Sequence, residues 1–146
     1  MLNLHETPTG FIEPITGVVE AALDAADGLS PGDVMVVGAW CRDIVHHALG
    51  HTFTTATTRD LDLALALSSW DAYNSIAAAF PRISHTGIRF RIVDVDVDLL
   101  PFGDVEDPQG IVKPPSRDET LSVWAFEEIF AASLPLALSP TMSVPT

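Results

Sequence analysis

The stretch Arg59-Asp60-Leu61-Asp62-Leu63-Ala64-Leu65 places two aspartates in an otherwise apolar run. Consecutive side chains of a β-strand point to opposite faces, so Asp60 and Asp62 share one face, with Cα atoms roughly 6.5 to 7 Å apart. The leucines occupy the other face. The stretch therefore predicts a strand over 61–67 that carries two carboxylates together on one side.

Two neighbouring ionised carboxylates repel each other, and burying either without a partner costs on the order of several kcal/mol. The pair therefore predicts a compensating cation. Oxygen ligands suit Mg²⁺ or the similar Mn²⁺, and Mg²⁺ is usually bound by one or two carboxylates together with substrate phosphates. A nucleotide is the expected third partner. The alternative is a pair of exposed carboxylates on an edge strand, where charge prevents pairing with another chain.

A second acidic segment, Val93-Asp94-Val95-Asp96-Val97-Asp98-Leu99-Leu100, alternates aspartate with apolar residues. This period of two puts all three aspartates on one face. If the segment pairs beside 61–67, the two strands lie about 4.8 Å apart, and Asp98 can join Asp60 and Asp62. Three such carboxylates could frame two metal ions about 3.5 to 4 Å apart. Asp98 would then be a proton acceptor or a metal ligand, whereas we expect Asp94 and Asp96 to be solvated edge residues.

Gly38 and Ala39 stand between the short apolar run 34–37, a predicted strand, and the helical pattern of 39–49. A glycine allows close approach to the backbone, and the amides at a helix N-terminus receive phosphate oxygens. Gly38 and Ala39 are therefore candidate nucleotide-binding residues. Arg42 and Arg59 could contact phosphate as well. The alternative for each is an ion pair with a nearby acid, such as Asp43 for Arg42.

The remaining periodicities indicate one α/β (α+β) domain over 1–146, with a small mixed β-sheet flanked by helices. Three further helices are expected over 11–29, from Ser68 or Ser69 to Phe80, and over 121–134, and residues 88–100 should form one long or hairpinned strand. Residues 103–119 are expected to be irregular and 139–146 to be a flexible tail. The three tryptophans are expected in the core: Trp40, Trp70 and Trp124.

Composition limits the partners and the compartment. Twenty acidic residues against seven basic ones give a formal charge of −13, which repels polyanions, so general DNA binding is not expected. The single cysteine suits a reducing compartment. We find neither a signal-peptide pattern nor an apolar run near the roughly 18 residues of a membrane span, so we expect a cytoplasmic protein without a membrane partner.

Taken in order, these motifs resemble a known family: Val37-Gly38-Ala39, Arg42-Asp43, Thr58-x-Asp60-Leu61-Asp62 and Val97-Asp98-Leu99-Leu100-Pro101-Phe102-Gly103. They are similar to those of the polymerase-β-type nucleotidyltransferases, and within these to the AbiEii/AbiGii-type toxins. The resemblance implies a nucleotidyltransferase fold. It also implies a phosphate motif at Gly38 and Ala39, a metal pair at Asp60 and Asp62, and a third carboxylate at Asp98.

By this resemblance the chain would be a magnesium-dependent enzyme that moves a nucleoside monophosphate from an NTP to an acceptor hydroxyl. The acceptor could be tRNA in a toxin-antitoxin system. Alternatively, a minimal nucleotidyltransferase could modify a protein partner such as a cognate antitoxin, or a non-catalytic module could keep the fold for partner binding.

The family's toxins also carry a lysine- and arginine-containing motif in a C-terminal helical part, and this sequence has one lysine, Lys113, in a predicted loop. The chain is therefore expected to correspond to the family's N-terminal core. Three explanations are open for the absence of these cations: the chain is truncated, another subunit supplies them, or Arg42 and Arg59 take their place.

Overall fold

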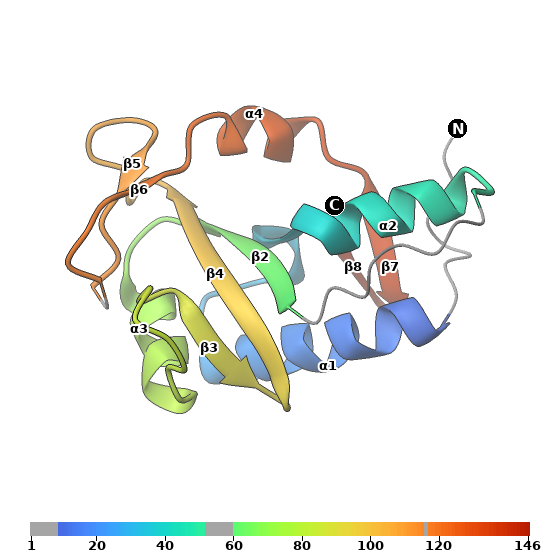
Figure 1. Cartoon of the computed structure of the whole chain (residues 1–146), viewed down its shortest axis with the longest axis horizontal. Helices are drawn as coiled ribbons and strands as arrows, with labels where there is room; N and C mark the ends of the chain where they lie inside the picture. The colour runs from blue at the N-terminus through green and yellow to red at the C-terminus, as the bar shows by residue number, and fades with distance from the viewer. Residues whose placement is uncertain (1–8, 52–59, 116) are drawn as a thin grey trace.

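The computed structural model describes residues 9–51, 60–115 and 117–146. The elements follow one another as α1 (Thr9–Ala25), η2 (Pro31–Asp33), β1 (Val34–Val37), α2 (Gly38–Ala48), β2 (Asp60–Leu67), α3 (Asp71–Ala79), β3 (Arg89–Ile92), β4 (Val95–Gly103), β5 (Ile111–Val112), β6 (Leu121–Ser122), α4 (Phe126–Ala131), β7 (Pro135–Ser139) and β8 (Met142–Pro145). Figure 1 shows the sheet between α1 on one side and α4 on the other.

The main sheet has four strands in the order β1-β2-β4-β3. The central strands β2 and β4 run parallel, and the outer strands β1 and β3 are antiparallel to their neighbours. The mixed α/β architecture predicted from the sequence is therefore confirmed at this level. Because Asp62 pairs with β1 on one side of β2 and with β4 on the other, the edge-strand explanation does not apply to Asp62.

One face of this sheet carries the larger apolar cluster. Alternate residues of β2 and β4 point into it, as the period of two requires, and α1 and α3 cover it (Figure 1). Its fully buried members include Ile15, Val18, Leu61, Leu63, Tyr73, Ile76, Phe90, Val97 and Leu99. The helix α1 ends at Ala25, before the predicted end at residue 29, and Gly28 beyond it has the positive φ of +87° that is common just after a helix.

The opposite face is divided along the strands. Towards the carboxyl ends of β2 and β4, Phe102 packs against Phe126 and Phe130, with ring centroids 5.9 Å and 5.4 Å away. Met35, Ala64, Val112 and Val123 complete this second cluster. Towards the amino ends of the same two strands, the face carries Asp60, Asp62, Asp96 and Asp98 instead.

The predicted acidic strand folds as a hairpin. Val93 and Asp94 have φ values of 48° and 61° and form the turn between β3 and β4, so Asp94 is not on the strand with the other two aspartates. Two consecutive positive φ angles match the twist of a tight hairpin. Asp96 lies on the interior strand β4 and is half-buried beside Arg91, so its prediction as a solvated edge residue is wrong.

The predicted helix over 121–134 is also wrong in most of its length. Leu121 and Ser122 pair with β5, and α4 covers only Phe126–Ala131. Val123 is buried in the second cluster, and the chain then turns through a left-handed Ala125, with a φ of +72°, before α4 begins. Trp124 is consequently 81% exposed rather than a core residue.

Residues 139–146 are not the flexible tail that the sequence predicted. They complete the β7–β8 hairpin, in which Leu136, Leu138 and Val144 are buried. The backbones of Leu134 and Thr146 form two hydrogen bonds of 2.9 Å, and the Thr146 hydroxyl donates to the Val36 carbonyl. The alternation of apolar and polar residues outweighs the proline and serine content here.

None of the helices in the described ranges has the length and apolar character needed to cross a bilayer.

Candidate functional site

The acidic residues of β2 and β4 converge in space. The parallel register places Asp60 beside Asp96 and Asp62 beside Asp98, on the same face of the sheet. On the other side of β2, Asp62 pairs with Val37, the last residue of β1. The predicted meeting of Asp60, Asp62 and Asp98 is therefore observed, at the amino ends of the two parallel strands.

Arg89 lies among these carboxylates, and sequence reasoning missed it. It is opposite Asp98 in the antiparallel pairing of β3 with β4. Its Nε donates to Asp98 Oδ1 at 2.7 Å and its Nη2 to Asp98 Oδ2 at 2.9 Å, and Nη2 also lies 3.1 Å from Asp60 Oδ2. The hydrogen bond to Asp98 and the surrounding carboxylates raise the pKa of Arg89 above its ordinary value. In the structure the cation between Asp60 and Asp98 is thus a guanidinium.

A signal for this arrangement was present in the sequence. In Arg89-Phe90-Arg91-Ile92, arginines alternate with apolar residues at the same period as the aspartates of β4. In the hairpin, Arg91 Nε lies 2.6 Å from Asp96 Oδ1, and Arg89 pairs with Asp98. Alternating cations beside alternating anions are typical of paired strands.

Asp62 is the least compensated of the three carboxylates. Burial raises its pKa, and the negative charges of Asp98 and Asp60 raise it further, while Arg89 partly opposes them. Within the described ranges Asp62 forms no ion pair. A half-buried carboxylate in this position favours an additional cation.

Gly38 makes the close approach of α2 to Asp62 possible. It has a φ of +68°, and a Cβ at this position would lie 2.2 Å from Asp62 Oδ2 and 3.0 Å from Asp62 Cγ. Both the backbone conformation and the space therefore require glycine. The helix begins here without a side-chain cap from Val37, so the first-turn amides beside Asp62 remain suited to an anion.

The remaining predicted residues have different positions. Ala39 is in the first turn of α2, and the next residue, Trp40, donates from Nε1 to the Asp60 carbonyl at 3.1 Å, which ties α2 to the start of β2. Arg42 Nε is 2.8 Å from Asp43 Oδ1, the alternative that the sequence left open. Arg59 lies outside the described residues.

The donor atoms of this cluster are of the type that a hard divalent cation binds. Carboxylate oxygens are the ligands that Mg²⁺ prefers, and the cradle formed by Gly38 holds one of them, that of Asp62, without a paired cation. In the described part of the chain, no three acidic, histidine or cysteine side chains are arranged as ligands around one point. The guanidinium of Arg89 bridges two of the carboxylates in question.

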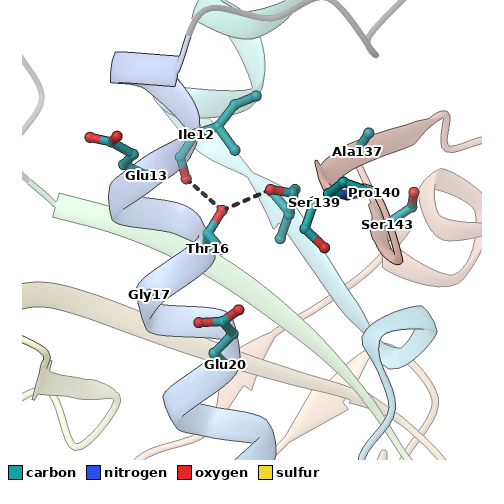
Figure 2. A pocket seen from close by; sticks show the side chains of 10 residues that line it. Ile12, Glu13, Thr16, Gly17, Glu20, Ala137, Ser139, Pro140 and Ser143 are labelled. Atoms are coloured by element: carbon teal, nitrogen blue, oxygen red, sulfur yellow. Dashed lines mark hydrogen bonds between the residues drawn. The ribbon is translucent and has the colours of Figure 1, made fainter.

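A groove with a volume of about 720 Å³ lies elsewhere, between α1 and the β7–β8 hairpin (Figure 2). The hydroxyl of Thr16 on α1 lies 3.0 Å from the carbonyl oxygen of Ile12 and 3.4 Å from that of Leu138 on β7. Glu13 and Glu20 are the charged residues that line it. Their negative charge does not suit a phosphate ligand, and the groove is separate from the carboxylates of β2 and β4.

No protein-family model, curated protein or solved structure matches the chain.

Proposed function

We propose that this chain is a magnesium-dependent nucleotidyltransferase that moves a nucleoside monophosphate from an NTP to an acceptor hydroxyl. The observation that carries the proposal is the parallel pairing of Asp60 and Asp62 with Asp96 and Asp98, directly beside the glycine that starts α2. The sequence resemblance to polymerase-β-type nucleotidyltransferases of the AbiEii/AbiGii type supports the same activity and the corresponding nucleotidyltransferase fold.

In this proposal Asp60, Asp62 and Asp98 hold Mg²⁺ or Mn²⁺. When bound, the metal lowers the pKa of the acceptor hydroxyl and balances charge on the phosphates. The amides of Gly38 and Ala39, at the positive end of α2, bind phosphate oxygens. The carboxylate of Asp98 accepts the proton of the acceptor hydroxyl.

The transfer step balances as a substitution at the α-phosphorus. The acceptor oxygen forms a bond to this phosphorus, and the bond from it to the oxygen that bridges to the β-phosphate breaks. Pyrophosphate leaves with that electron pair, and the hydroxyl proton passes to Asp98. The acceptor is an RNA end, such as that of tRNA in a toxin-antitoxin system, or a hydroxyl of a partner protein. The formal charge of −13 favours a positively charged protein partner.

The test is incorporation of label from each of four α-³²P-labelled NTPs, with Mg²⁺, into total RNA and into proteins encoded beside the gene. We expect label in one of these acceptors and none with Asp62→Asn. Asp94→Asn is the matched control, because it removes the same charge from an exposed turn outside the carboxylate cluster. Absence of label in every acceptor, or full activity of Asp62→Asn, would contradict the proposal.

A second candidate is a non-catalytic binding module with the same fold. Arg89 favours it, because its ion pairs already compensate Asp60 and Asp98 without metal. Isothermal titration with an NTP, with and without Mg²⁺, separates the two candidates: metal-dependent nucleotide binding supports the enzyme, and its absence supports the module.

A further inference from the structure

We propose that Arg89 is the triphosphate-binding cation of this site and that, without ligand, it is held by ion pairs with Asp60 and Asp98, two of the residues that would hold the metal. This inference rests on the proposed function and adds a residue that neither the motifs nor the resemblance identified. Arg89 would exchange its carboxylate partners for phosphate oxygens when metal and nucleotide bind.

Arg89 contacts two of the three proposed metal ligands. Nε and Nη2 form a two-pronged contact with both oxygens of Asp98, and Nη2 also reaches Asp60. This fork of N–H donors fits the oxygens of a phosphate as well as those of a carboxylate. Arg89 thus has the geometry to bind a phosphate as well as a carboxylate.

Arg89 compensates only part of the charge of the carboxylates. When ionised, the three carboxylates outnumber the single guanidinium by two negative charges, so the cluster attracts a dication even while Arg89 is in place. The oxygens that Arg89 occupies belong to two of the three proposed metal ligands. A dication bound by those oxygens would repel the guanidinium at short range, whereas a triphosphate beside the metal would attract it.

The Arg89 side chain is accessible to solvent. It is 31% exposed, so its guanidinium can turn away from the carboxylates without unpacking the core. Arg42 and Arg91, also on described elements, pair with Asp43 and Asp96 instead. Of these three arginines, Arg89 is the one that contacts the proposed metal ligands.

Two binding measurements on the full chain test the exchange. Mn²⁺ affinity is measured by electron paramagnetic resonance, and the affinity for a non-hydrolysable NTP analogue by calorimetry at saturating Mg²⁺. For Arg89→Gln we expect Mn²⁺ alone to bind roughly three- to tenfold more tightly, because a competitor is lost, and the analogue to bind roughly tenfold more weakly. The opposite signs of the two changes are the signature of the exchange.

Arg117→Gln is the control, since it removes an arginine that is ion-paired with Glu119 outside the carboxylate cluster, and both affinities should stay at the wild-type values. Arg89→Lys keeps the charge but not the fork, so it should still compete with Mn²⁺ and should bind the analogue more weakly than the wild type does. Circular dichroism of each variant confirms that it folds, and Arg89→Lys gives the decisive analogue measurement if Arg89→Gln does not fold.

The results distinguish this inference from the function on which it rests. If Arg89→Gln does not tighten Mn²⁺ binding, or Arg89→Gln and Arg89→Lys both bind the analogue as the wild type does, the role of Arg89 is overturned while wild-type transfer activity still supports the enzyme. If no variant and no wild-type protein binds Mn²⁺ or the analogue, both proposals fail.

Discussion

Gly38→Ala is the substitution whose effect the structure defines best. Two penalties are expected. The first is backbone strain, because Gly38 has a φ of +68° and a left-handed L-residue costs about 1–2 kcal/mol. The second is steric, because the added Cβ would lie 2.2 Å from Asp62 Oδ2.

The steric penalty cannot be removed by moving the carboxylate oxygen alone. The same Cβ would lie 3.0 Å from Asp62 Cγ and 3.2 Å from Asp62 Cβ, so the whole side chain must leave its rotamer. A displaced rotamer costs about 0.5–1.5 kcal/mol. Together with the strain, we expect Gly38→Ala to lower the free energy of unfolding by about 1.5–3.5 kcal/mol. For a chain of this size that corresponds to a fall in Tm of roughly 3–14 °C.

Gly28→Ala isolates the strain. Gly28 has a φ of +87°, and a Cβ there would meet nothing within 4 Å among the described residues. Urea unfolding at pH 7 of both variants should therefore give a smaller loss for Gly28→Ala, and the difference measures the clash with Asp62. Asp62→Ala in the Gly38→Ala background should recover part of that difference. Equal losses for the two glycine variants would refute the close approach of α2 to Asp62.

Two further substitutions test the electrostatics and the packing of the same sheet face. Because burial raises the pKa of Asp62, its ionised form destabilises the fold at neutral pH, and this penalty disappears as the pH falls through the raised pKa towards the ordinary value of 3.8. Asp62→Asn should therefore raise the free energy of unfolding at pH 7 but not near pH 3.8 in urea titrations, and a loss at pH 7 would contradict the argument. Phe102→Ala should lower the free energy of unfolding by about 3–5 kcal/mol because it leaves a cavity in the second cluster. Trp124→Ala should change stability by less than about 0.5 kcal/mol because this side chain is exposed, and comparable losses in thermal melts would be inconsistent with the structure.

The parts of the fold that the sequence predicted well are those where local signals agree. The strands around 34–37 and 61–67 combine apolar character with clear boundaries, and both are present. Ser69 Oγ accepts a hydrogen bond from the Asp71 amide at the start of α3, as expected of a residue before a helix. The convergence of Asp60 with Asp98 followed from pairing two such strands.

The parts that failed depend on long-range contacts. The pattern of 121–134 is compatible with a helix, but Val123 is buried beside Phe102 and Val112, and the pairing of β5 with β6 decides its conformation. Arg89 meets Asp98 only through the register of the β3–β4 hairpin, which its turn sets. A single sequence shows which residues are charged, but it does not show the strand register that brings them together.

The direction of β1 explains why this site lies where it does. Because β1 is antiparallel to β2, its last residue Val37 pairs with Asp62 near the amino end of β2, and α2 therefore begins beside the carboxylates. The apolar cluster around Phe102 occupies the other half of the same face. The apolar residues and the charged residues thus occupy opposite ends of β2 and β4, so repulsion among the aspartates need not disturb the packing under α4. Such a division allows one end of the face to keep uncompensated negative charge, which is the property that a cation-dependent site requires.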